Sequence, residues 1–122
     1  MPIPSIRISD ANSQPIRGDG GYVLYWMIAF RRTRYNLSLQ HAVRRASELG
    51  KPLLIFEPLR VRYRWASDRI HRFIIEGMRD NAVSLAEKNV TYFPYVEPEP
   101  GRGTPLLATL AKSACLVVTD EY

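Results

Sequence analysis

The segment from Tyr22 to Ser38 most constrains the fold, because it joins an apolar run to the start of a helix without a single glycine. An apolar strand, a turn and a helix in this order are typical of a crossover in a parallel sheet. Dinucleotide folds and P-loops need glycines in such a turn, so that the backbone can approach a phosphate. This turn instead carries Arg31, Arg32 and Arg34, at the sheet edge where open parallel sheets bind ligands. The sequence therefore predicts an α/β fold without a glycine-rich phosphate site.

Apolar runs and helical patterns alternate along the rest of the chain. The expected strands are 22–27, 52–56, 90–96 and 116–120, and the expected helices are 36–50, 67–89 and a short one from 104. Glu57-Pro58 is expected to break the second strand. Because parallel neighbours need crossovers of one hand, the pattern predicts a Rossmann-like open parallel sheet with strand order 3-2-1-4 and helices on both faces. A fifth strand outside this chain is an open alternative.

Capping residues and apolar faces define the expected helices more closely. Asn36 is expected to cap the first helix, and Gly50 to end it in a left-handed conformation. Gly77 in the second helix indicates close packing against the sheet. Thr104-Pro105 is expected as an N-cap followed by a proline at the first helical position. The expected core faces are Leu39, Ala42, Val43, Ala46 and Leu49 in the first helix and Ile70, Phe73, Ile74, Met78 and Leu85 in the second.

The composition suits one globular domain, since 46% of the 122 residues are hydrophobic and 24% are charged. Residues 1–21 are expected to form an irregular arm, and residues 22–122 the α/β domain. Cys115 is the single cysteine, so one copy holds no disulfide or cysteine-based metal site, and we expect a buried thiol in a reducing compartment. No apolar run approaches the roughly 20 residues of a membrane span, and no signal-peptide pattern begins the chain. We therefore expect a cytoplasmic protein without membrane contact.

Charge is distributed unevenly along the chain. From Arg31 to Arg79 there are twelve basic and four acidic residues, whereas from Asp80 to Tyr122 there are three basic and six acidic residues. Arginine supplies fourteen of the seventeen basic residues, and its planar group suits phosphates and aromatic rings. Contact with nucleic acid is one interpretation, while solvated arginines are the more common one.

The sequence contains no recognisable catalytic or metal-binding pattern, so neither kind of residue is assigned. His41 and His71 lie on separate expected helices without a second ligand at helical spacing, and no nucleophile is paired with a base. Asp120 and Glu121 form either paired carboxylates at a strand end or a solvated loop. Trp26, in a buried strand, is expected in the core.

Three motifs resemble the N-terminal domain of DNA photolyases, most closely the class II branch, and together they cover roughly residues 22–122. They are Tyr25-Trp26-Met27 followed by Arg32 and Asn36, the helix 67–79, and the last strand 116–120, which ends in Thr119-Asp120. The family usually has a charged pair where this chain has Ala29-Phe30, and an aspartate where it has Tyr35. An altered or empty pigment pocket is therefore an alternative for the first turn.

The resemblance implies a light-driven DNA repair enzyme. In that family a reduced FAD, bound in a helical domain that this chain lacks, passes an electron to a cyclobutane pyrimidine dimer flipped out of UV-damaged DNA. The N-terminal domain houses an antenna pigment, a deazaflavin or a folate, and packs against the FAD-binding domain of the same chain. The damaged DNA is held mainly by the helical domain, so this fragment alone is expected to bind no FAD and to be inactive.

The resemblance also implies which residues line the antenna site. The candidates are Trp26, Met27, Ile28, Arg32, Asn36, Phe56, Glu57, Asp120 and Glu121. Two alternatives to a repair enzyme remain. A cryptochrome-like blue-light sensor would share the fold and the flavin, whereas a free-standing nucleotide-binding α/β domain is disfavoured by the missing glycine-rich loop.

Overall fold

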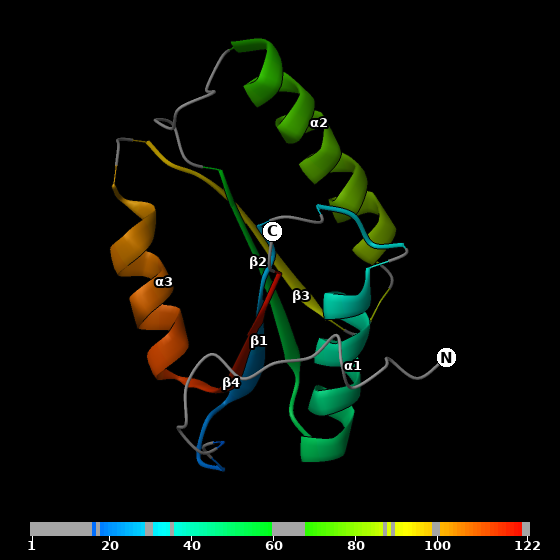
Figure 1. Cartoon of the computed structure of the whole chain (residues 1–122), viewed down its shortest axis with the longest axis vertical. Coiled ribbons are helices and arrows are strands. Elements are labelled where there is room, and N and C mark those ends of the chain that lie inside the picture. Colours follow the sequence, from blue (N-terminus) through cyan, green and yellow to red (C-terminus); the bar gives the residue numbers. More distant parts are fainter. Residues whose placement is uncertain are drawn as a thin grey trace.

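The computed structural model describes residues 16, 18–28, 31–34, 36–59, 68–86, 88, 90–98 and 101–120. The elements in chain order are β1 (Tyr22–Trp26), α1 (Leu37–Leu49), β2 (Leu53–Leu59), α2 (Asp68–Leu85), β3 (Thr91–Val96), α3 (Gly103–Lys112) and β4 (Ala114–Thr119). The four strands pair in parallel in the order β3-β2-β1-β4 (Figure 1). The expected α/β architecture is therefore confirmed, including its strand order.

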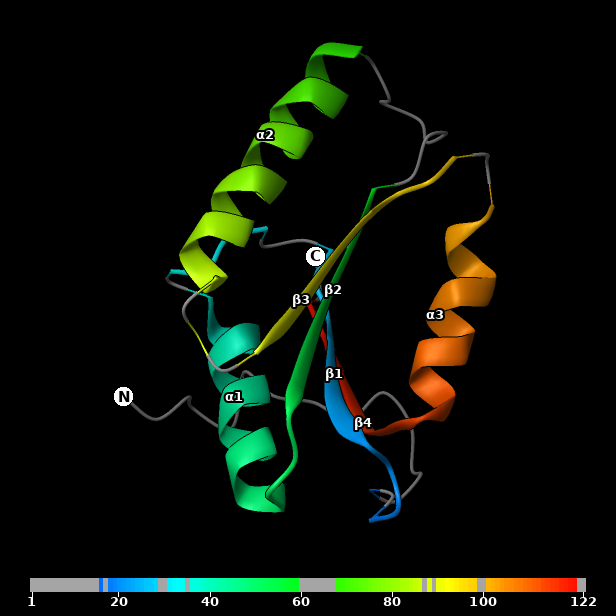
Figure 2. The same ribbon diagram turned by 180° about the vertical axis from the view of Figure 1, so that it is seen from behind.

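The helices cover both faces of the sheet, as the two opposite views in Figures 1 and 2 show. Side chains alternate along a strand, so Val23 and Tyr25 of β1 point to one face and Leu24 to the other. The first face packs against α1 and against Leu85 at the end of α2. The second face, with Leu24 and Phe56 at its centre, packs against leucines of α3. Burial on both faces explains why β1 is an apolar run rather than an alternating one.

Both ends of α1 form as the sequence predicts. Asn36 Oδ1 accepts a hydrogen bond of 3.0 Å from the backbone N–H of Leu39, which satisfies one of the free donors of the first turn. Gly50 ends the helix with φ at 65°, a conformation that glycine adopts without steric cost. These two caps fix where the chain leaves the first turn and where it returns to β2.

The strands end at different heights on the carboxyl edge of the sheet. Trp26 ends β1 and is the register partner of Phe56 in β2 and of Thr119, which ends β4. Beyond Phe56, β2 continues to Leu59, which pairs with Val96 of β3. The β2–β3 pair therefore extends past the ends of β1 and β4.

The extension of β2 shows that the expected break at Glu57-Pro58 is wrong. Leu59 O accepts a hydrogen bond of 3.0 Å from Glu97 N, so the backbone of Leu59 faces β3. Backbone groups of successive residues face opposite neighbours, which turns Pro58 toward the side of β1. Because β1 has already ended there, no neighbouring strand requires a hydrogen bond from the backbone N–H that proline lacks.

Several expectations for the helix faces are corrected. Val43 in α1 and Phe73 in α2 were expected in the core, yet 48% and 76% of their surfaces are exposed. Met78 and Leu85 are buried as expected. Phe73 lies five residues before Met78, on another side of the helix, and the first half of α2 extends beyond the sheet (Figure 1). The close packing expected at Gly77 is also wrong, because no described atom outside the neighbouring helix backbone lies within 4 Å of the position that a Cβ would take.

The start of α3 differs from the expected cap at Thr104-Pro105. The helix begins at Gly103, whose N–H donates a hydrogen bond of 2.8 Å to Glu97 Oε2. A buried carboxylate from the end of β3 thus satisfies this helix start, where the sequence suggested a threonine hydroxyl. Ser67, Asn89 and the side chain of Ile70 lie outside the described residues. Within the described ranges, no helix combines the length and the apolar character needed to cross a membrane.

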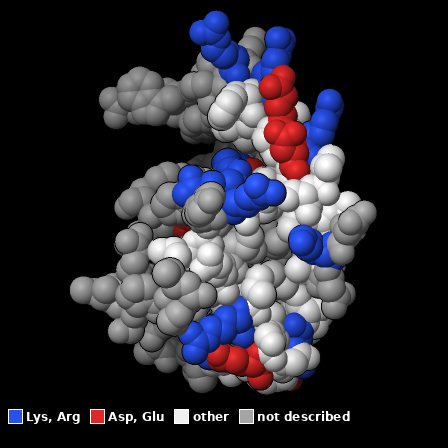
Figure 3. All heavy atoms as spheres, turned by 90° about the vertical axis from the view of Figure 1, so that its right-hand side faces the viewer, with Lys and Arg blue, Asp and Glu red and all other residues white. Residues whose placement is uncertain are grey.

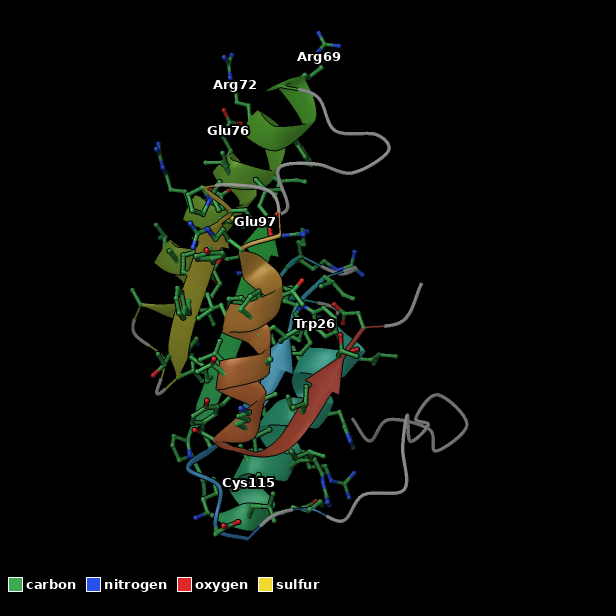
Figure 4. All side chains as sticks on the ribbon, turned by 90° about the vertical axis from the view of Figure 1, so that its left-hand side faces the viewer. Trp26, Arg69, Arg72, Glu76, Glu97 and Cys115 are labelled. Atoms are coloured by element: carbon green, nitrogen blue, oxygen red, sulfur yellow. The ribbon has the colours of Figure 1, made fainter. Side chains whose placement is uncertain are left out.

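The segment before β1 packs closely on the start of β4. The Cys115 thiol is buried, as expected, and Sγ donates to Gly20 O at 3.1 Å. Figure 4 shows Cys115 at the end of the sheet opposite to Trp26. At Gly20, a Cβ would lie 2.3 Å from Cys115 N, a separation that no real side chain tolerates.

We expect Gly20→Ala to destabilise the protein by about 1–3 kcal/mol, because the added methyl group forces the two backbone segments apart. Urea unfolding measures the difference. Gly18→Ala is the matched control, since no described atom outside its chain neighbours lies within 4 Å of a Cβ at that position. Equal free energies of unfolding for the two variants would contradict this account of the packing.

Candidate functional site

A buried chain of hydrogen bonds joins the carboxyl ends of β1 and β4. Tyr25 Oη donates to Asp120 Oδ1 at 2.7 Å, and Asn36 Nδ2 donates to the same phenol oxygen at 2.9 Å. Asp120 Oδ2 accepts the backbone N–H of Ile28 at 3.2 Å. Asp120 is 3% exposed, so the solvated-loop alternative does not hold for this residue. Glu121, the other carboxylate of the expected pair, lies outside the described residues.

A second cluster surrounds Glu57, which is fully buried in β2. Asn81 of α2 donates to Oε1 at 2.9 Å, and Tyr92 of β3 donates to the same oxygen at 2.7 Å. Arg31, in the turn after β1, forms an ion pair with Oε2 at 3.1 Å and donates to Pro58 O at 2.9 Å. A buried charge is tolerated when it is both paired and hydrogen-bonded, and Glu57 meets both conditions.

The two tyrosines of these clusters have strongly perturbed ionisation. Burial raises the pKa of Tyr25 well above its ordinary value, and the hydrogen bond to Asp120 raises it further. Burial and the hydrogen bond to Glu57 raise the pKa of Tyr92 in the same way. Both phenols therefore stay protonated and act as fixed donors to a carboxylate.

The structure brings the described antenna candidates to one edge of the sheet and divides them into two groups. The buried group is Met27, Asn36, Phe56, Glu57 and Asp120, and the more exposed group is Trp26, Ile28 and Arg32. The polar residues of the buried group use their side-chain atoms in bonds within the protein. Members of the exposed group, rather than the carboxylates, are therefore the residues open to a ligand.

Trp26 differs from its neighbours in one respect. Its Nε1 is a buried donor without a hydrogen-bond partner, the single side-chain nitrogen or oxygen of this kind in the part of the chain that the structure describes. Its backbone oxygen accepts a bond of 2.9 Å from Thr119 Oγ1, which holds the end of β1 against β4. Buried donors are usually satisfied, so this ring N–H is an exception at the carboxyl edge, where the partly exposed indole packs against the Leu24–Phe56 cluster.

Two hollows in the described surface lie away from these residues. One, of about 400 Å³, is on α2, and the other, of about 200 Å³, is at the opposite end of the strands. No group of three or more histidine, cysteine or carboxylate side chains that could hold a metal ion occurs among the described residues. The first hollow is lined by Arg69, Arg72, Phe73 and Glu76, and the second by Tyr22, Pro52, Leu53, Leu54 and Thr91.

Sequence reasoning missed three residues that organise this edge: Tyr25, Asn81 and Tyr92. Asn81 carried a usable signal, because it lies between Met78 and Leu85 at helical spacing on the buried face of α2. A polar side chain on an apolar face needs a buried partner, and Glu57 is that partner. For Tyr25 and Tyr92 no signal existed, since aromatic residues are common in buried strands without any polar role.

Comparisons with known proteins point to one family. No family model matches the chain. A deoxyribodipyrimidine photo-lyase from Methanothermobacter thermautotrophicus is 33% identical over 115 residues, which is 94% of this chain and 25% of that relative. This similarity to a photo-lyase agrees with the resemblance carried by the sequence motifs. It does not separate the class II branch from the others, and the chain spans about a quarter of the length of this photolyase.

We expect Glu57→Ala to destabilise this domain by about 3 kcal/mol, because it leaves donors of Arg31, Asn81 and Tyr92 without their acceptor. Thermal or urea unfolding measures the loss. Glu48→Ala is the control, since it removes an equally charged but exposed partner of two α1 arginines and should change stability little. Equal losses in the two variants would contradict the role of the buried cluster.

The raised pKa values of Tyr25 and Tyr92 predict how stability depends on pH. Tyrosines in the unfolded chain ionise near pH 10, whereas these two phenols keep their protons in the folded protein. The folded state then binds more protons, so their contribution is complete below about pH 10 and is lost as the pH rises further. Urea unfolding at several alkaline pH values should show this fall, and a shallower fall in the variant Tyr25→Phe/Tyr92→Phe. An identical pH dependence in both proteins would refute the assignment.

Proposed function

We propose that this chain is the N-terminal α/β domain of a light-dependent DNA repair enzyme that splits cyclobutane pyrimidine dimers with reduced FAD. The observation that carries the proposal is the identity of 33% with a photo-lyase, sustained over 94% of the chain. The parallel sheet of order β3-β2-β1-β4 agrees with it. The turn after β1 carries arginines and no glycine, which argues against an independent nucleotide-binding domain.

The catalytic parts of such an enzyme belong to polypeptide beyond this chain, because the chain corresponds to a quarter of its relative. When bound there, the reduced FAD supplies the electron that splits the dimer. In this proposal the partners of the domain are the FAD-binding domain of the same protein and, mainly through that domain, UV-damaged DNA. The α/β domain itself supplies no catalytic residue.

We assign an antenna pigment, a deazaflavin or a folate, to the carboxyl edge of the sheet. The more exposed candidates Trp26, Ile28 and Arg32 are the residues that would touch it. Asp120 and Glu57 would act from beneath, because Asp120 links the ends of β1 and β4, and Glu57 ties the turn after β1, α2 and β3 to β2. The residues present thus fit a flat pigment resting on the rim, with no buried carboxylate in contact.

The full-length protein that contains this chain tests the repair proposal. After purification it should carry FAD and should convert cyclobutane dimers in an irradiated oligonucleotide to monomers under blue light, with no conversion in the dark. The dark reaction is the control. A protein with bound flavin that leaves the dimers intact in light would favour the sensor instead, and a protein without flavin would refute both.

The same preparation tests the antenna assignment. Trp26→Phe/Arg32→Gln should remove the pigment absorbance while dimer splitting under strong light persists, because FAD is still excited directly. Arg34→Gln is the matched control, since it removes an equally exposed arginine from the same turn. Full retention of the pigment in the double variant would show that it binds elsewhere.

A further inference from the structure

The first turns of α2 present an unusual combination of side chains. Phe73 is 76% exposed and lines a hollow of about 400 Å³ together with Arg69, Arg72 and Glu76. Figure 4 shows Arg69 and Arg72 projecting away from the body of the domain at the free end of the helix, with Glu76 just below them. We call these four residues the α2 patch.

Helix geometry separates this patch from the core. Residues three and four apart share a face, so Met78, Asn81 and Leu85 define the buried side of α2. Phe73 lies five residues before Met78, a rotation that places it on another side of the helix. The patch therefore plays no part in packing α2 onto the sheet, and its aromatic ring stands in water at a cost to solvation.

The arginines of the patch differ from other arginines of the domain. Arg44 and Arg45 of α1 share the Glu48 carboxylate, and Arg31 pairs with Glu57. Within the described part of the chain, neither Arg69 nor Arg72 makes an ion pair. Figure 3 shows basic side chains projecting at the upper end of this side of the molecule, with acidic ones directly below them.

We propose that the α2 patch binds single-stranded nucleic acid, with Arg69 and Arg72 on backbone phosphates and the ring of Phe73 stacked on an unpaired base. Guanidinium groups match phosphate oxygens in a fork geometry, and exposed aromatic rings beside basic residues are the usual platform for unpaired bases. This contact lies on the α/β domain itself. It goes beyond the proposed function and does not depend on light, flavin or dimer repair.

Glu76 distinguishes binding at the α2 patch from a general attraction of nucleic acid to positive charge. Its carboxylate lines the same hollow and is negatively charged like a phosphate, so it repels the phosphate at short range and opposes binding. Asp80, one turn further along and also exposed, continues the acidic side. The patch therefore ends at Glu76 and is limited to the first two turns, the length that one or two nucleotides occupy.

The test uses the 122-residue chain and a fluorescently labelled oligothymidylate of about twelve nucleotides, with anisotropy measured at about 50 mM salt. Arg69→Gln/Arg72→Gln should weaken binding about ten-fold and reduce the dependence of affinity on salt, because two phosphate contacts are lost. Phe73→Ala should weaken it by a similar factor through lost stacking. Glu76→Gln should strengthen it.

The control variant is Arg44→Gln/Arg45→Gln, which makes the same change in net charge on α1 and should leave the affinity close to that of the parent chain. All substituted side chains are on helix surfaces, and circular dichroism confirms that each variant is folded. Equal weakening by the two arginine pairs, or no effect of Glu76→Gln and Phe73→Ala, would overturn the proposal. Unchanged affinity after loss of Arg69 and Arg72 would overturn it as well.

Discussion

The ion pair between Arg31 and the buried Glu57 is the interaction on which the geometry of the carboxyl edge depends. Through Glu57, the turn after β1 is tied to β2, and through Asn81 and Tyr92 the same carboxylate holds α2 and β3. Four separate elements therefore meet at one charged group. A buried charge with a single partner is a weak source of stability, but several donors on one carboxylate specify a unique arrangement of the elements around it.

The sequence predicted the architecture better than it predicted the side-chain contacts at the carboxyl edge of the sheet. Strand order, the Asn36 cap and the Gly50 end of α1 followed from periodicity and local backbone chemistry, which act over a few residues. The break at Pro58 was wrong because its effect depends on where a neighbouring strand ends. The core position expected for Phe73 was wrong because this residue lies on another side of α2 than Met78 and Leu85. Partners such as Asp120 and Tyr25, 95 positions apart, are set by the sheet register alone.

Arginine has two different roles in this domain. At the carboxyl edge and on α1, arginines are paired with carboxylates and belong to the structure of the fold. On α2, Arg69 and Arg72 extend past the sheet without such partners among the described residues. The same residue type thus occurs in paired positions within the fold and on an exposed helix surface, and the neighbouring carboxylates distinguish the two.

The unequal heights of the strands give the carboxyl edge the form of a step. Since β2 and β3 continue three residues beyond the last partners in β1, the β2–β3 pair extends about 10 Å further than the neighbouring strands. The ends of β1 and β4 form the lower part of this edge. The turn after β1 lies against this extension, where Arg31 reaches Glu57 and Pro58 of β2. Strand length thereby decides that the outer part of β2 is contacted by the turn that follows β1 and not by β1 itself.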